Sequence, residues 1–194
     1  WLLAVLLTAI ALTPIASLMS ERKLSSVSIL YLLLTIGFGL WGLSWPYRKQ
    51  ASGGLLLDMG RTWQSKILFW IGIMEGGIAT FVTWLSFSRL LGGPDTVEGL
   101  LRMSSVAFWW TLSALLISIG LSKLELREKG ICFLYTVIPW QRVSACRWED
   151  SSRNTFTIEV RRRLSLSPGF IRMKVLERQR NEIERIVTAN IHRS

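Results

Sequence analysis

Glu75 is the residue whose type and position most demand a chemical explanation. It lies near the centre of an apolar segment, residues 67–85, where a charged side chain costs about 2.5–3.5 kcal/mol to insert into a bilayer. A buried acid of this kind hydrogen-bonds to a neighbouring helix, ligates a pigment or an ion, or relays protons. No other apolar segment of the chain contains an acid, a histidine or a lysine, so the sequence favours helix packing over transport.

Small residues surround Glu75 on the same segment. Gly72 and Gly76 form a G-x-x-x-G pair, and Gly77 follows directly. Faces of this kind let two helices approach closely in a membrane. The sequence therefore predicts that Gly72, Glu75, Gly76 and Gly77 form a contact surface, either within this chain or with a partner protein.

The densest basic cluster lies near the other end of the chain. It consists of the run Arg161, Arg162 and Arg163, together with Arg172 and Lys174 on what we expect to be the next strand. One interpretation is a solvated strand end. The other is a docking surface for anionic headgroups or an acidic partner, where each basic side chain contributes about 1 kcal/mol.

Other reactive residues do not assemble into a recognisable site. His192 is the single histidine, so acid/base or triad chemistry based on histidine is not expected. Cys132 and Cys146 are too widely spaced for a zinc site and are interpreted as small buried apolar residues. We predict no catalytic residue, no metal site and no identifiable cofactor. A bound chlorophyll, carotenoid or lipid stays open because tryptophans are abundant near the ends of the apolar segments.

Four apolar segments are long enough to cross the hydrocarbon core, which takes about 20 residues of helix. They are residues 1–19, 27–45, 67–85 and 106–122. Each is predicted to be helical because backbone groups in lipid must pair within the segment. Pro46 is expected to end the second segment, residues 46–66 to form a loop, and residues 96–103 to form a short interfacial helix. No basic stretch precedes the first segment, so we expect it to remain as a helix and not to act as a signal peptide.

Charge divides the chain into two predicted domains. Residues 1–122 hold 8 basic and 5 acidic side chains, and residues 123–194 hold 15 and 8. This predicts a transmembrane domain over 1–122 and a basic, water-exposed domain over 123–194. Basic residues after the last span place both termini in the cytoplasm or its organellar equivalent. For a basic domain tethered to a bilayer, the anionic leaflet is a simpler partner than nucleic acid, which we do not expect.

The basic domain carries a strand pattern followed by a helix pattern. Apolar and polar residues alternate over short runs, which predicts strands at residues 124–127, 131–135, 137–139, 143–148, 155–161 and 170–176. Residues 177–192 then change to helical spacing, with the apolar positions Ile183, Ile186, Val187 and Ile191. The predicted fold class is four transmembrane helices plus a small α+β domain: a strand meander capped by a helix, as in pleckstrin-homology-like folds.

The sequence also resembles known families. LELREKGI at residues 124–131 and VIPWQRV at 137–143 resemble the start of bacterial pleckstrin-homology-like domains attached to membrane helices. The whole chain is similar to an uncharacterised family of cyanobacterial multi-span membrane proteins with such a domain, and its architecture resembles that of the photosystem I assembly factor Ycf-four. This resemblance implies a thylakoid or plasma-membrane location and a role beside photosynthetic complexes.

These observations lead to three functional hypotheses. The first is a non-enzymatic membrane subunit or assembly factor that binds a larger membrane complex, with a photosystem as the partner implied by the resemblance. The second is a transporter or channel component organised around Glu75. The third is a sensor that binds anionic lipid through its basic domain.

Overall fold

The computed structural model describes residues 21–90, 96–148, 155–161, 169–175 and 179–191. The chain divides into two compact units. One, the helical unit, comprises Trp1–Trp41 and Gly72–Leu115, and the other, the strand unit, comprises Gly42–Ile71 and Leu116–Ser194. Three long helices run through both units, so the chain passes between them at several points.

The long helices are α2 (Glu21–Leu43), α4 (Trp63–Leu90) and α5 (Thr96–Leu121). Within the described residues, three helical stretches are long and apolar enough to cross a membrane: Val27–Ala51, Trp63–Ser88 and Gly99–Leu121. This confirms the membrane character of the helical part. The first expected span, residues 1–19, lies outside the described residues, so the total of four spans stays a prediction.

The helix boundaries differ from those expected. The prediction of a separate interfacial helix over residues 96–103 was wrong, because α5 begins at Thr96 and continues without a break. Similarly, Pro46 does not end the helical path. The turn comes at Ser44, and Pro46 occupies the first turn of the short helix α3 (Trp45–Ala51), where its missing N–H has no helical partner to lose.

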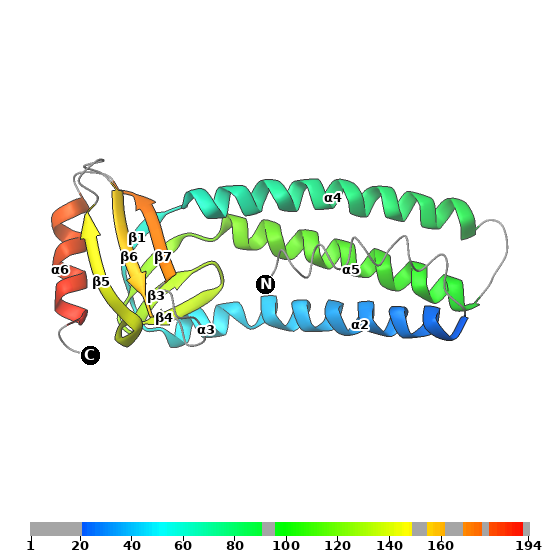
Figure 1. The fold of residues 1–194 in the computed structure, drawn as a ribbon, viewed down its shortest axis with the longest axis horizontal. Helices are drawn as coiled ribbons and strands as arrows, with labels where there is room; N and C mark the ends of the chain where they lie inside the picture. The colour runs from blue at the N-terminus through cyan, green and yellow to red at the C-terminus, as the bar shows by residue number, and fades with distance from the viewer. Residues whose placement is uncertain (1–20, 91–95, 149–154, 162–168, 176–178, 192–194) are drawn as a thin grey trace. The chain divides into compact units, whose positions relative to one another are not determined.

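The helices of the helical unit lie alongside one another (Figure 1). The ring of Tyr31 on α2 packs 5.2 Å from that of Phe108 on α5, measured between centroids. Phe108 and Leu112 of α5 are almost fully buried. In contrast, α2 and α4 expose many large apolar side chains, among them Leu33 and Trp84, as expected for surfaces that face lipid or a partner.

The strand unit contains two antiparallel sheets. The first has the order β1-β2-β3-β4, with β1 (Leu55–Gly60), β2 (Leu124–Arg127), β3 (Gly130–Phe133) and β4 (Thr136–Pro139). After the 3-10 helix η1 (Trp140–Arg142), the second sheet follows with β5 (Val143–Trp148), β6 (Thr155–Val160) and β7 (Gly169–Lys174). Helix α6 (Arg180–Ile191) ends the described chain. This confirms an α+β domain, and each predicted strand has a counterpart.

Strand β1 was not predicted. It lies within residues 46–66, which were expected to form a loop, and it pairs with β2 so that Leu57 faces Leu126 and Asp58 faces Glu125. In the sequence, α4 and α5 therefore separate two strands that are neighbours in one sheet. Little in the sequence signals this pairing, because the partner strand begins more than sixty residues later.

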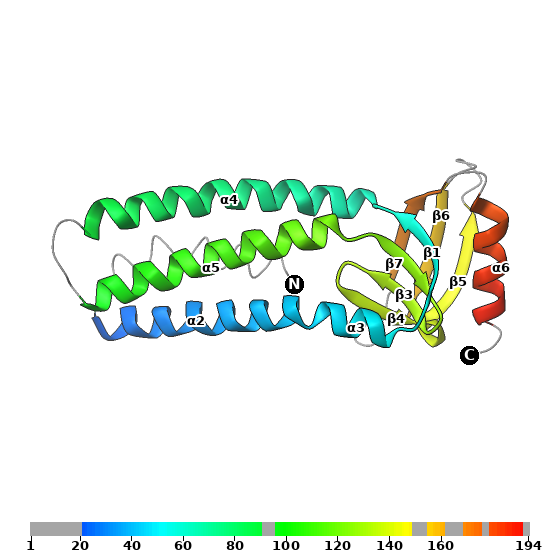
Figure 2. The same cartoon turned by 180° about the vertical axis from the view of Figure 1, so that it is seen from behind.

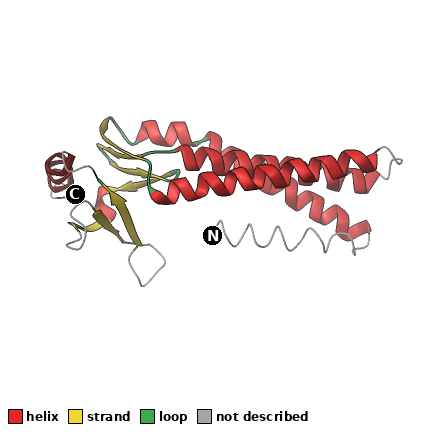
Figure 3. Ribbon diagram, turned by 90° about the horizontal axis from the view of Figure 1, so that it is seen from above, coloured by secondary structure: helices red, strands yellow, loops and turns green. Residues whose placement is uncertain are grey.

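A single apolar core holds the strand unit together. It joins side chains of both sheets to η1 and α6: Leu124, Leu126, Ile131, Trp140, Val143, Phe156, Ile158, Ile171, Val175, Ile183 and Val187. Figure 2 shows α6 beside the second sheet, and Figure 3 shows the strands and their connecting turns. Ile183 and Val187 are buried as the helical spacing predicted, and the side chain of Ile191 lies outside the described ones.

Candidate functional site

The start of α4 is fixed by a threonine cap. The hydroxyl of Thr62 accepts a hydrogen bond from the Ser65 N–H at 3.2 Å, and the Ser65 hydroxyl donates to the Thr62 carbonyl at 2.8 Å. A capping threonine satisfies an N–H that the helix itself leaves unpaired. The cap places Trp63 and Lys66 on the first turn, and Trp63 is also where the candidate span begins.

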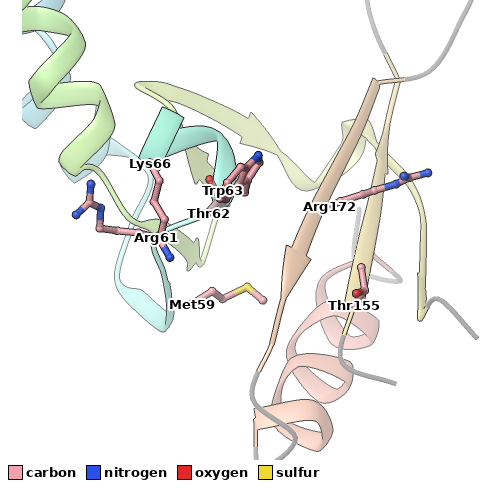
Figure 4. A pocket seen from close by; sticks show the side chains of 7 residues that line it. All are labelled: Met59, Arg61, Thr62, Trp63, Lys66, Thr155 and Arg172. Carbon is pink, nitrogen blue, oxygen red and sulfur yellow. The ribbon is translucent and has the colours of Figure 1, made fainter. Parts of the chain in front are cut away.

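A cavity of about 510 Å³ opens beside this turn, and we call it the Lys66 pocket. Its lining consists of Met59, Arg61, Thr62, Trp63, Lys66, Thr155 and Arg172. Figure 4 shows Trp63 and Lys66 on one side, and Thr155 and Arg172 on strands β6 and β7 on the other. Among the described residues, the lining contains three basic side chains, two hydroxyls and no acid. It therefore has the composition of an anion site.

The three basic side chains of the Lys66 pocket have different roles in the fold. The Arg61 guanidinium donates to the Gly120 carbonyl from Nε at 3.1 Å and from Nη2 at 2.9 Å, and it lies 5.2 Å from the Phe69 ring centroid. Arg61 thus occupies a carbonyl at the end of α5 that has no helical partner. Lys66 is exposed, and Figure 4 shows the exposed Arg172 pointing away from it.

The predicted basic cluster is only partly described. Arg161 is exposed, and its N–H donates to the Arg142 carbonyl at 2.8 Å. Arg162, Arg163 and the side chain of Lys174 lie outside what the structure describes. Arg172 lies opposite Thr157 in the β6–β7 register and contributes to the Lys66 pocket.

The glycine face of α4 is turned toward α5 at two of its positions. The Ser113 hydroxyl donates to the Gly72 carbonyl at 2.9 Å, and a Cβ placed on Gly76 would lie 3.1 Å from the same hydroxyl oxygen. A Cβ placed on Gly77 would meet no atom of the described residues within 4 Å. Gly72 and Gly76 therefore accommodate α5, whereas Gly77 does not take part in this contact.

Glu75 is buried in the helical unit, with 4% of its surface exposed. Within the described part of the chain, its Oε2 atom has no hydrogen-bond partner. The indole N–H of Trp109 on α5 is likewise buried without one. An isolated polar group costs several kcal/mol at membrane depth, and no described residue compensates the Oε2 atom of Glu75.

A network of charged groups joins α3 to the first sheet. Glu125 on β2 accepts hydrogen bonds from Lys49 Nζ at 2.6 Å and from Arg127 Nε and Nη2 at 3.0 and 2.9 Å. Arg127 Nη1 also donates to the carbonyls of Lys49 and Gly53, at 3.0 and 2.9 Å. One guanidinium thus binds both the carboxylate and the end of α3.

A second ion pair lies near this network and borders a cavity of about 400 Å³. Lys123 Nζ lies 2.6 Å from Asp58 Oδ2 on β1. Partial burial would raise the pKa of Asp58, but the hydrogen bonds from Lys123 and the Gly60 N–H, with nearby positive charge, outweigh it and leave the pKa below its ordinary value. The same pair raises the pKa of Lys123.

Sequence reasoning missed the Lys66 pocket. Taken from the sequence alone, Arg61 and Lys66 only add to the positive charge around the spans. A signal was nevertheless present, since a threonine cap followed by tryptophan and lysine at the start of an apolar run is typical of a helix entering the headgroup region. Among the described residues, no group of three or more histidine, cysteine or acidic side chains is arranged to hold a metal ion.

Comparison with known proteins adds one match. Residues 122–192 are similar to a family described as a domain of unknown function, DUF5673. The matched range contains β2 to β7 and α6, and it leaves out β1 and the long helices. No curated protein and no solved structure matched the chain.

Proposed function

We propose that this protein is a non-enzymatic docking platform of a membrane: a subunit or assembly factor that holds a small folded domain at the lipid surface for a protein partner. The observation that carries the proposal is the position of β1. Because β1 precedes α4 and β2 follows α5, the two helices are inserted in the sequence between paired strands of the domain. The domain is therefore connected to the helices through more than one segment of chain.

Several contacts inside the strand unit support a permanent attachment. Arg127 binds the end of α3 through the Lys49 and Gly53 carbonyls, and Arg61 binds the end of α5 through the Gly120 carbonyl. Hydrogen bonds to a charged group of this kind typically contribute about 1.5–3 kcal/mol each. A domain attached in this way suits constant presentation to a partner better than reversible recruitment from solution.

The finer fold class is also part of the proposal. A four-stranded and a three-stranded antiparallel sheet, with a C-terminal helix in their common core, agree with a pleckstrin-homology-like domain. In that interpretation the α4–α5 hairpin is an insertion between the first two strands. The excess of basic residues in the domain favours the cytoplasmic side. The thylakoid location and the photosystem as partner stay predictions.

The test is site-specific photocrosslinking in native membranes. A photoreactive residue replaces Leu33, Trp84 or Phe87, which expose 62%, 64% and 65% of their surface. The matched control replaces Leu112, which is 1% exposed. We expect a discrete protein adduct from at least one exposed position and none from the control. Lipid adducts at every exposed position, with the protein migrating as a monomer in native gels, would overturn the proposal.

The position of Glu75 favours a second candidate, a transport or channel component. Its carboxyl group is buried at membrane depth, and Oε2 has no partner among the described residues, as expected for a group that binds a proton or cation in passing. The experiment is flux of protons or monovalent cations into proteoliposomes, for the unchanged protein and for Glu75→Gln. Equal flux in both, at the level of empty liposomes, removes this candidate.

A further inference from the structure

We propose that the Lys66 pocket binds the phosphate of an anionic lipid headgroup. This inference goes beyond the docking function and does not depend on it, because a platform could bind its partner without a lipid in this cavity. It rests on three features of the pocket: its charge, its size and its place at the start of a candidate membrane span.

The charge of the lining favours an anion. The ionisable residues among the described lining, Arg61, Lys66 and Arg172, are all basic. The hydroxyls of Thr62 and Thr155 add hydrogen-bonding groups. Lysine binds phosphate as a point charge, and arginine can bind it through two parallel N–H groups.

The size suits a headgroup. A volume of about 510 Å³ falls within the range of about 300–1,000 Å³ that is usual for small-molecule sites. Met59 and Trp63 supply apolar surface beside the basic groups, so the lining offers contacts to both the charged and the uncharged parts of a lipid. The Arg61 side chain donates to the Gly120 carbonyl, and the exposed Lys66 lies on the same side of the pocket.

The position of the pocket favours a lipid over a soluble phosphate or an acidic peptide. Trp63 is the first residue of the candidate span and exposes 74% of its surface, and tryptophan at a span end sits at headgroup depth. Lys66 lies one turn further along the same helix. Lipid phosphates are concentrated at this depth, whereas soluble anions must compete with them from the water.

The pocket also depends on the membrane helix. Four of its lining residues, Arg61, Thr62, Trp63 and Lys66, come from the chain that enters and begins α4. The opposite side comes from β6 and β7. A strand domain without the α4–α5 insertion would lack the first of these two sides, so the site is a property of the combined chain.

The experiment uses the full chain in micelles of a neutral detergent, titrated with dioctanoyl phosphatidylglycerol and followed by native mass spectrometry. We compare Lys66→Gln and Arg172→Gln with the matched controls Lys129→Gln and Arg142→Gln, which remove exposed charges outside the lining. Each pocket variant is expected to weaken binding about fivefold, the equivalent of about 1 kcal/mol per basic side chain. The controls are expected to change it less than twofold.

Two further titrations identify the source of the phosphate. Dioctanoyl phosphatidylcholine should bind more weakly than phosphatidylglycerol, and inorganic phosphate should displace phosphatidylglycerol only at far higher concentration. Equal displacement by inorganic phosphate, equal loss in pocket and control variants, or no saturable binding would each overturn the proposal. Thermal unfolding of every variant without lipid checks that the loss comes from the site and not from the fold.

Discussion

Replacing Glu125 with alanine should release the end of α3 from the first sheet. The carboxylate is 9% exposed and accepts hydrogen bonds from two cations, Lys49 and Arg127. Arg127 is itself only 14% exposed, so the substitution leaves a largely buried guanidinium without its counter-ion. Breaking a buried pair in this way costs about 3–5 kcal/mol.

The two partners of Glu125 should differ in importance. Lys49 is 33% exposed, and solvent screening limits a pair of that kind to about 0.2–1 kcal/mol. For a chain of this size each kcal/mol shifts the melting temperature by about 2–4 °C. Glu125→Ala is therefore expected to lower the melting temperature by about 6–20 °C, and Lys49→Met by no more than about 4 °C.

The assay is thermal unfolding in detergent, combined with hydrogen exchange of peptides that cover residues 45–60. Glu125→Ala should speed exchange in that range because Arg127 also holds the carbonyls of Lys49 and Gly53. The matched control is Glu184→Ala, which breaks an exposed helix pair with Arg180 and should change little. Equal effects of Glu125→Ala and Lys49→Met would refute the reasoning, as would unchanged exchange over residues 45–60.

Three further predictions concern single sites. Gly120→Ala should destabilise the protein by about 1–3 kcal/mol because a Cβ at this position meets the backbone of α4. The control Gly77→Ala should be neutral because its Cβ meets no described atom, and equal melting temperatures of the two variants would contradict this prediction. Asp58→Asn should lower the free energy of unfolding near neutral pH, because the lowered pKa of Asp58 stabilises the fold only while the acid is charged. The difference between the variant and the unchanged protein should vanish as the pH falls below 3.8. High salt should also reduce this difference, because the ion pair with Lys123 is largely exposed. Burial raises the pKa of Cys146 from 9.0 to about 11. Its alkylation near pH 8 should therefore be about 100-fold slower than that of a free thiol, as measured by peptide mass spectrometry. Equal alkylation rates would show that this cysteine is accessible.

Local patterns in the sequence were enough to predict most strands and the three long apolar helices that the structure describes. An apolar run of about 17 residues or more identifies a span from its own composition, and the alternation in 124–127 or 155–161 identifies a strand without knowledge of its partner. The C-terminal helix was predicted for the same reason, since the spacing of Ile183 and Val187 is visible within two turns. Both side chains are buried in the core.

Features that depend on distant pairing were not visible. Strand β1 is a short apolar stretch, Leu55–Leu57, followed by Asp58, and only the alignment with β2 makes it a strand. The Lys66 pocket joins residues 59–66 with Thr155 and Arg172, which no single window contains. The sequence also does not determine which face of α4 is turned toward α5. It therefore could not predict that Gly76 lies against Ser113 and that Gly77 does not.

The pairing of β1 with β2 constrains how the chain crosses a membrane, independently of any count of charges. The two strands are neighbours in one sheet, so they must lie on the same side of the bilayer. The chain between them contains α4 and α5, which are both long and apolar enough to span. An even number of crossings must therefore separate the strands, and this number is two if α4 and α5 both span the bilayer. Since β1 precedes α4 and β2 follows α5 in the chain, the first sheet can close only after both helices have been synthesised.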